Sequence, residues 1–210
     1  MKTLAKMHGR LVHSRRVRRL AGGIARWLEP TWSLADIGCG DGRLGALIQE
    51  LAPRVKVTGY EVLQRGETHI PVTVFDGQRI PAEDNSVDAA LLSDVLHHTD
   101  DPLILLREAA RVARRAVIIK DHRTSRPLAK PVLRFMDWIG NRPHGVALPY
   151  NYWAETQWRS AWNDLGLRVE QFETDLGLYP WPANWAFESG LHILVMLRPE
   201  SNNVQQRRAA

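Results

Sequence analysis

A strand-like run that turns into three alternate glycines is the part of this 210-residue chain best suited to hold a small molecule. It reads Leu34-Ala-Asp-Ile-Gly-Cys-Gly-Asp-Gly-Arg-Leu-Gly45. Gly38, Gly40 and Gly42 lack a Cβ atom, so the backbone can turn tightly and a ligand can approach it closely, near the free N–H groups of the helix that follows. Asp36 adds a negative charge beside this loop. The pattern predicts a ligand-binding turn between a strand and a helix.

The spacing of the glycines argues against a dinucleotide site. A dinucleotide fingerprint reads G-x-G-x-x-G, and the position of its third glycine holds Arg43 here. Cys39, the single cysteine of the chain, lies between two of the glycines. A nucleophilic cysteine needs a neighbouring base, so we interpret Cys39 as a small residue that fills the loop. A single cysteine also excludes a disulfide framework and a cysteine-cluster metal site, and we expect no metal site.

Acidic residues and histidines follow two later strand-like segments and could move a proton. Open α/β sheets bind ligands beyond the carboxyl ends of their strands, and histidine exchanges protons near neutral pH. The candidates are Asp94, His97, His98, Asp121 and His122. Adjacent histidines point in different directions, and packing around a bound ligand is the simpler interpretation of His97 and His98. The candidate catalytic residues are His122, His98 and Tyr152, of which His122 and Tyr152 are the better candidates for contacts with a second substrate.

The glycine-rich run from Asp36 to Gly42 and the segments after it resemble the motifs of the class I S-adenosylmethionine-dependent methyltransferases, whose first motif reads acidic-x-Gly-x-Gly-x-Gly. Residues 55–61 look like the second strand of that family, and Glu61 matches the carboxylate that binds both ribose hydroxyls. Residues 72–77 are similar to the third strand, and Asp76 matches the aspartate that contacts the adenine amino group. Residues 87–102 look like the fourth strand and its loop in quinone-biosynthesis enzymes of the methyltransferase type 11 group.

The resemblance covers residues 34–122 and implies S-adenosylmethionine as the cofactor. It also implies an α/β fold, with a Rossmann-like, doubly wound, seven-stranded and mostly parallel sheet whose last strand is antiparallel and whose two faces carry helices. The cofactor-binding residues that it implies are Asp36, Gly38, Cys39, Gly40, Gly42, Glu61, Val62, Asp76, Gly77 and Asp94.

Apolar periodicity and turn signals predict elements that agree with this fold. Strands are expected near residues 34–38, 55–61, 72–76, 87–93, 116–121, 168–173 and 191–197. Helices are expected near residues 8–28, 42–52, 102–113 and 154–165. We expect one domain over residues 1–198 and a polar, disordered tail over residues 199–210.

An insert over residues 123–153, after the fifth strand, departs from a minimal domain of this kind and is expected to form a substrate cap. Leu128, Val132, Phe135, Met136 and Ile139 fall on one face of a possible helix, which could instead simply pack on the core. Aromatic residues also gather in loops over residues 141–153 and 178–187. They either cap the edge of the sheet or line an apolar substrate pocket.

Positive charge is concentrated at the N-terminus. Residues 1–28 hold eight basic residues and no acidic one, whereas the rest of the chain holds 20 basic and 23 acidic residues. Apolar residues at helical spacing predict a basic amphipathic helix within residues 1–30. This arm could cover the cofactor pocket, or contact an anionic membrane surface or an acidic substrate group. Nucleic-acid binding and a targeting sequence are less favoured interpretations.

The sequence thus predicts a cytoplasmic methyltransferase that transfers a methyl group to a small, apolar or amphiphilic acceptor. No apolar run reaches the roughly 18 residues of a membrane-spanning helix. An RNA or protein methyltransferase that uses the basic arm is one alternative, but residues 93–98 lack an Asn/Asp-Pro-Pro-aromatic signature of amino methylation. A binding module that holds the cofactor without turnover is another. The sequence does not identify the acceptor molecule, the acceptor atom or the oligomeric state.

Overall fold

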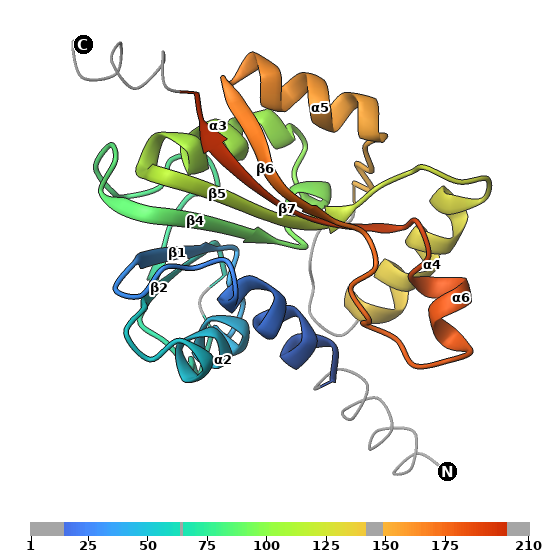
Figure 1. Ribbon diagram of the computed structural model, residues 1–210, viewed down its shortest axis with the longest axis horizontal. Coiled ribbons are helices and arrows are strands. Elements are labelled where there is room, and N and C mark those ends of the chain that lie inside the picture. The colour runs from blue at the N-terminus through green and yellow to red at the C-terminus, as the bar shows by residue number, and fades with distance from the viewer. Residues whose placement is uncertain (1–14, 64, 142–148, 201–210) are drawn as a thin grey trace.

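The computed structural model describes residues 15–63, 65–141 and 149–200, which form a seven-stranded sheet in the order β3-β2-β1-β4-β5-β7-β6 (Figure 1). The strands are β1 (Ser33–Ile37), β2 (Lys56–Glu61), β3 (Val72–Val74), β4 (Val87–Ser93), β5 (Ala113–His122), β6 (Leu167–Glu173) and β7 (His192–Pro199). β7 runs antiparallel to both of its neighbours, and the other neighbouring strands are parallel. The predicted fold is confirmed.

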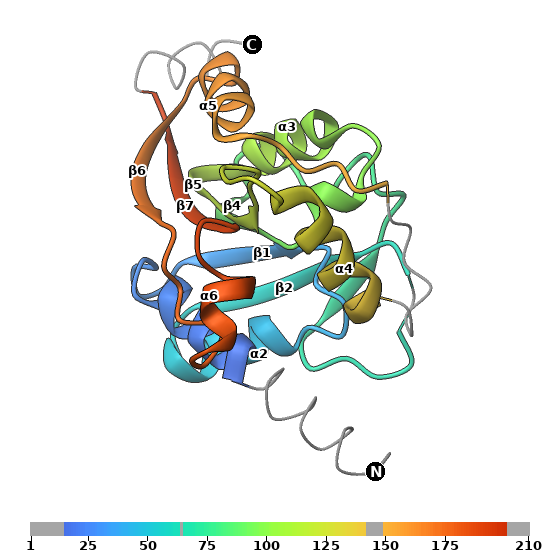
Figure 2. The same ribbon diagram turned by 90° about the vertical axis from the view of Figure 1, so that its right-hand side faces the viewer.

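Helices cover both faces of this sheet. They are α2 (Arg43–Leu51), α3 (Pro102–Val112), α4 (Ala129–Asn141), α5 (Glu155–Asp164), α6 (Ala183–Phe187), the short 3₁₀ turn η1 (Leu96–His98) and a helix over residues 15–25, called the N-terminal helix below. In Figure 1, α3 and α5 lie above the sheet, and the N-terminal helix and α2 lie below it. α4 and α6 lie beyond the carboxyl ends of the central strands (Figure 2).

The two faces enclose two separate hydrophobic cores because successive side chains of a strand point to opposite sides. In β1, Leu34 packs with the N-terminal helix and α2, whereas Ala35 packs with α3 and α5. Both faces are buried, so β4 reads as a nearly continuous apolar run. Gly23, near the C-terminal end of the N-terminal helix, allows close packing on β7, since a Cβ atom there would lie 3.3 Å from Leu194 Cδ2.

Several element boundaries differ from those predicted. β5 begins at Ala113 rather than near residue 116, because Ala113 pairs with Val87 across a register shift. The N-terminal helix ends at residue 25 rather than 28, and residues 8–14 of that prediction lie outside the described part. α6 forms within a segment predicted to be a loop. The expected tail begins inside β7, and residues 201–210 lie outside the described part.

The expected start signal of α3 is confirmed. Asp101 is the N-cap residue, and its side chain accepts a hydrogen bond from the N–H of Leu103 at 2.9 Å. Pro102 occupies the first turn, where its missing N–H costs nothing. Among the described residues, no helix has the length and apolar character needed to cross a membrane.

Candidate active site

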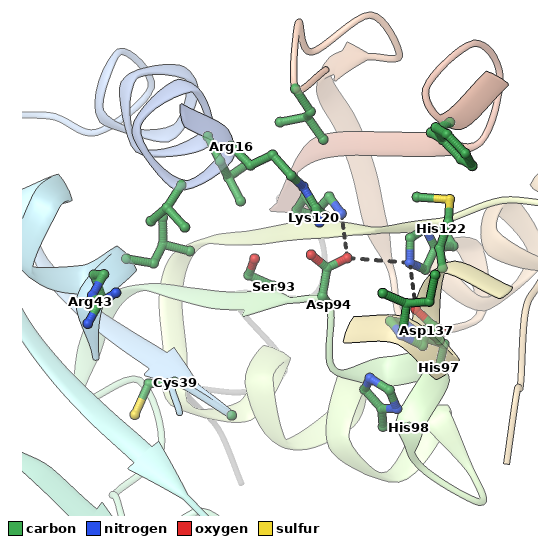
Figure 3. Close-up of a pocket in the computed structure, with 18 of the residues that line it drawn as sticks. Arg16, Cys39, Arg43, Ser93, Asp94, His97, His98, Lys120, His122 and Asp137 are labelled. Atoms are coloured by element: carbon green, nitrogen blue, oxygen red, sulfur yellow. Dashed lines mark hydrogen bonds and ion pairs between the residues drawn. The ribbon is translucent and has the colours of Figure 1, made fainter. Parts of the chain in front are cut away.

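A cavity of about 560 Å³ lies at the carboxyl ends of β1, β4 and β5 (Figure 3). Its volume is within the range of roughly 300–1,000 Å³ that is usual for small-molecule sites. One side is formed by the glycine loop after β1, and the other by the ends of β4 and β5 with α4 and α6. The N-terminal helix contributes Arg16, Val17 and Leu20, as expected of a helix that covers the pocket. Arg16 also lies over the ring of Tyr179, 4.9 Å from its centroid.

The glycine loop has the backbone conformation that its sequence requires. Gly38, Gly40 and Gly42 have φ angles of 70°, 60° and 76°, which residues with a Cβ atom rarely adopt. A Cβ atom on Gly38 would lie 2.5 Å from the side chain of Val95, whereas one on Gly40 would meet nothing within 4 Å. The loop is therefore packed against the protein at Gly38 and open at Gly40.

Two buried acidic residues, Glu61 and Asp36, lie against this loop. Glu61, at the end of β2, accepts hydrogen bonds from the N–H groups of Gly40 at 2.6 Å, Val62 at 3.0 Å and Leu63 at 3.2 Å. Asp36 is 2% exposed, and its Oδ2 atom has no hydrogen-bond partner. Burial and the negative charge of Glu61 raise the pKa of Asp36 to about 7.

Cys39 has the properties of a loop-filling residue. Burial and the negative charges of Asp36 and Glu61 raise the pKa of its thiol to about 12. The thiol is therefore protonated at neutral pH and is a poor nucleophile. Its sulfur lies against Gly59, where a Cβ atom would come within 2.5 Å of it.

The residues predicted to contact the ribose and adenine lie beside the cavity rather than on its wall. Asp76 follows β3, is exposed and accepts hydrogen bonds from the N–H groups of Arg79 and Gln78, which hold the pKa of its carboxyl below the ordinary value. A Cβ atom on Gly77 would lie 3.0 Å from Val62, so the ends of β2 and β3 meet here. The predicted residues found on the wall are Asp36, Gly38, Cys39, Asp94, His98 and His122, whereas Gly40, Gly42, Glu61, Val62, Asp76, Gly77 and Tyr152 are not.

At the other side of the cavity, Asp94 lies between Lys120 and His122 (Figure 3). Lys120 is fully buried and donates a hydrogen bond to Asp94 Oδ1. His122 Nε2 lies 3.8 Å from the same oxygen. Burial raises the pKa of Asp94, but Lys120, together with smaller contributions from His122, His97 and Arg16, outweighs burial and holds this pKa far below its usual range. Asp94 is thus a carboxylate.

His97 and Asp121 form a buried pair under the turn after β4. His97 Nδ1 lies 2.6 Å from Asp121 Oδ1, and an ionised carboxylate can only accept, so Nδ1 donates. His97 Nε2 lies 3.4 Å from Asp137 Oδ2, but the geometry is not that of a hydrogen bond. Burial lowers the pKa of His97, but Asp121, together with Asp137 and Asp94, outweighs burial and raises this pKa above its ordinary value.

His122 is held by His192. His192 Nε2 lies 2.9 Å from the carbonyl oxygen of Phe187, which can only accept, so Nε2 carries a proton. Burial lowers the pKa of His192 well below its ordinary value, so its Nδ1 is an acceptor. His122 Nδ1, at 3.1 Å, must then donate to it. Burial also lowers the pKa of His122, so its Nε2 is unprotonated and lies 3.5 Å from Asp137 Oδ1.

Tyr152 lies behind the cavity wall rather than on it. Its side chain is 7% exposed and its hydroxyl donates a hydrogen bond to Asp137. Burial and Asp137 raise the pKa of Tyr152, so the hydroxyl keeps its proton. In this structure Tyr152 therefore positions Asp137, which does line the cavity. His98, in contrast, is on the cavity wall with its ring 4.0 Å from that of His97, and burial lowers its pKa.

Four residues around the ends of β4 and β5 were not predicted from the sequence. Lys120 interrupts the apolar run of β5, and Asp137 interrupts the apolar face of α4, and these polar interruptions are the signals that could have revealed them. His192 had no comparable signal. Glu188 is buried and accepts hydrogen bonds from the N–H groups of three residues in the loop that borders the cavity. They are Leu176, Leu178 and Tyr179.

The strand order, the antiparallel β7 and the glycine loop at the end of β1 define a Rossmann-like α/β protein with a small-molecule site at the usual edge of its sheet. The family model for a methyltransferase domain matches residues 10–172. Since this match covers more than half of the chain, the protein belongs to that family, the class I S-adenosylmethionine-dependent methyltransferase domains.

Several solved structures share this fold at low sequence identity. The Trm112-bound methyltransferase of Haloferax volcanii is 16% identical, with a TM-score of 0.67, 93% of this chain covered and 96% of that chain. A methyltransferase from Aquifex aeolicus is 18% identical, with a TM-score of 0.55 and coverages of 82% and 85%. The [4+2]-cyclase SpnF is 18% identical, with a TM-score of 0.61 and coverages of 87% and 80%.

One curated relative is similar in sequence. It is an uncharacterised 37.1 kDa protein in a transposon of Streptomyces fradiae, 36% identical over 97 residues. The match covers 41% of this chain and 28% of the length of that relative.

The raised pKa of Asp36 predicts how stability depends on pH. The carboxyl titrates at about 3.9 in an unfolded chain and at about 7 in the folded protein. Between these values the folded state keeps a proton that the unfolded state releases, so this residue makes folding less favourable as pH rises. We expect Asp36→Asn to raise the free energy of unfolding above pH 7 by up to about 4 kcal/mol. Urea unfolding at several pH values, without ligand, measures this.

Asp88→Asn is the matched control because Asp88 is also buried but is well paired. Its carboxylate accepts hydrogen bonds from Ser33, Arg114 and Arg115. Burial raises the pKa of Asp88, but these partners hold it below the ordinary value, so this variant should be less stable than the wild type. If Asp36→Asn were equally destabilised above pH 7, Asp36 would not be an unsatisfied buried acid.

Proposed function

We propose that this protein transfers the methyl group of S-adenosylmethionine to a small, apolar or amphiphilic acceptor. The observation that carries the proposal is a single cavity that joins the glycine loop to the group of histidines and carboxylates at the ends of β4 and β5. Family membership supports S-adenosylmethionine as the methyl donor.

The residues beside the glycine loop fit this cofactor. The open space over Gly40 leaves room for a ligand close to the backbone, and the unpartnered Oδ2 of Asp36 offers a buried acceptor. S-adenosylmethionine carries an ammonium group and a sulfonium, and the cavity wall presents Asp36, Asp41 and Asp94. We propose that Asp36, the three glycines, Cys39 and Asp94 hold the amino-acid part, with Glu61 and Val62 at the ribose and Asp76 and Gly77 at the adenine.

The acceptor side of the cavity combines apolar walls with neutral histidines. When bound, S-adenosylmethionine supplies an electrophilic methyl group whose transfer needs alignment and a dry pocket. Phe135, Met136 and Ile139 of α4 and Phe187 of α6 line this side, which supports the insert over residues 123–153 as a substrate cap. Where the acceptor carries a proton, His122 and His98 stand on the wall to receive it.

The alternatives have less support. The acceptor side is a walled cavity with apolar lining, which suits a small molecule better than an RNA strand or a protein segment. A binding module without turnover would need no proton acceptor, yet two neutral histidines line the wall. The likeness to a [4+2]-cyclase reflects the fold alone.

Glu61→Ala tests the cofactor assignment. The variant removes the carboxylate that holds Gly40 and that we assign to the ribose, so affinity for S-adenosylhomocysteine should fall by about 1.5–3 kcal/mol, or roughly 10- to 150-fold. Isothermal titration calorimetry measures the change. Glu50→Ala, an exposed acid on α2, is the control and should bind like the wild type. Unchanged affinity of a folded Glu61→Ala would refute the assignment.

We also propose that this end of the molecule contacts an anionic membrane surface. Figure 2 looks onto it, with α4 and α6 toward the viewer and the N-terminal helix below them. Trp181 and Trp185 are 84% and 79% exposed, as suits aromatic side chains at a lipid interface. The exposed charged residues of the three helices are basic throughout the described part. They are Arg15, Arg18, Arg19, Lys130 and Arg134, with Arg26 at the end of the N-terminal helix.

Vesicle binding in a salt titration tests this contact. Phosphatidylcholine vesicles that contain phosphatidylglycerol should bind the protein, and Arg15→Gln with Arg18→Gln should weaken binding by about 1 kcal/mol per residue. Trp181→Ser with Trp185→Ser should remove the vesicle binding that persists at high salt, because salt does not screen apolar insertion.

The control pair for the arginines is Arg54→Gln with Lys56→Gln, at the opposite edge of the sheet where β2 begins. Leu51→Ser, at the end of α2, is the control for the tryptophans. Equal losses in test and control variants would mean a non-specific charge effect. Binding to RNA that collapses as salt rises, without vesicle binding, would favour nucleic acid instead.

A further inference from the structure

Two imidazole nitrogens and two carboxylates converge at the acceptor side of the cavity. The nearest donor atoms of Asp94, His97 and His122 all lie within 4.8 Å of one another. Asp137 adjoins them, with Oδ1 3.5 Å from His122 Nε2 and Oδ2 3.4 Å from His97 Nε2. All four residues are on the cavity wall (Figure 3).

The two histidines are oriented by partners on their far sides. His97 uses Nδ1 for its hydrogen bond to Asp121, and His122 uses Nδ1 for its hydrogen bond to His192. Both Nε2 atoms therefore point toward the same space, as they do in metal sites, where the second ring nitrogen is held by a carboxylate or another acceptor.

The Nε2 atom of His97 supplies an independent observation. The side chain of His97 is 2% exposed, and this nitrogen has no hydrogen-bond partner, although Asp137 Oδ2 is within 3.4 Å. A buried polar atom without a partner is costly, and native structures rarely keep one without a reason. A cation between the nitrogens and the carboxylates would satisfy His97, His122 and both acids together.

We propose that Asp94, His97 and His122, with Asp137 beside them, bind a divalent transition-metal ion. Two imidazoles with carboxylates suit iron(II), cobalt, nickel or zinc, whereas magnesium prefers an all-oxygen set. Lys120 donates to Asp94 Oδ1 and fixes the orientation of that carboxylate. This inference replaces the expectation of no metal site, which rested on the lone cysteine.

The site faces the acceptor side, so it also narrows the acceptor class. An ion held here meets a ligand that enters beside Phe135 and Met136, and selects acceptors with an oxygen donor such as a hydroxyl group. This narrowing rests on the proposed methyl transfer, whereas the ion site does not. With the ion bound, His122 is a ligand and cannot receive a proton, so that role falls to His98, which lies on the wall outside the ligand set.

Equilibrium dialysis of the full chain, treated with EDTA and then exposed to cobalt(II) or zinc, tests the proposal. We expect one equivalent of ion per chain and visible ligand-field absorption of the cobalt form. An excess of magnesium of about tenfold should not displace the ion. His97→Gln and His122→Gln should each lower affinity by about 100-fold or more. Asp121→Asn, which removes the charge that orients the His97 ring but leaves the ligands in place, should lower it by about 10- to 100-fold.

His69→Gln is the matched control, because His69 also lies beside a carboxylate, 3.9 Å from Asp41, but outside the cluster. It should bind cobalt like the wild type. If His97→Gln does not fold, the cobalt spectrum of the wild type and the cobalt affinity of Asp121→Asn still test the site. A wild type that takes up no ion, or an affinity unchanged by folded His122→Gln and Asp121→Asn, overturns the site. An equal loss of cobalt affinity in His69→Gln and in the cluster variants would also overturn the site, because the ion would then be adventitious.

Titration of the same EDTA-treated protein with S-adenosylhomocysteine separates this inference from the proposed function. Binding of that ligand without uptake of an ion would remove the metal site and leave the cofactor assignment in place. Uptake of the ion without binding of S-adenosylhomocysteine would leave the metal site in place and remove the cofactor assignment.

Discussion

One buried carboxylate, Asp121, orders the part of the structure on which the cavity depends. It is 1% exposed and accepts hydrogen bonds from the N–H groups of Leu96 and His122 and from Nδ1 of His97. A buried charge without partners is strongly destabilising, so these donors must be in place together. They come from the turn after β4 and the end of β5, and the charge therefore fixes one relative to the other. The direction of the His97 ring follows from it, whereas the His122 ring is held by His192.

The cofactor half of the cavity could be predicted because its determinants are local. Each left-handed position of the loop holds a glycine, and Asp101 with Pro102 marks the start of α3. These features depend on residues a few positions apart, which a sequence displays directly. The start of β5 was placed too late for the opposite reason, since Ala113 becomes part of the strand through pairing with Val87, a distant residue.

The acceptor half could be predicted only in part, because its contacts join residues far apart in the sequence. His122 and His98 were found from their place after strands, but His192, 70 residues from His122, becomes its partner only through the antiparallel pairing of β5 and β7. Tyr152 shows the limit of residue type as evidence. A tyrosine in a loop suits substrate contact and structural support equally, and its hydroxyl is committed here to Asp137.

The two halves of the cavity therefore carry different kinds of information about the reaction. The fold is shared with proteins as different as a methyltransferase and a [4+2]-cyclase at 18% identity, so the fold alone does not define the reaction. We infer that the choice of reaction arises at the acceptor side of the cavity, which α4, α6 and the network around Asp121 form. There, histidine Nε2 atoms and carboxylates lie beside apolar side chains, and any ligand that enters must match both the polar and the apolar groups of the cavity wall.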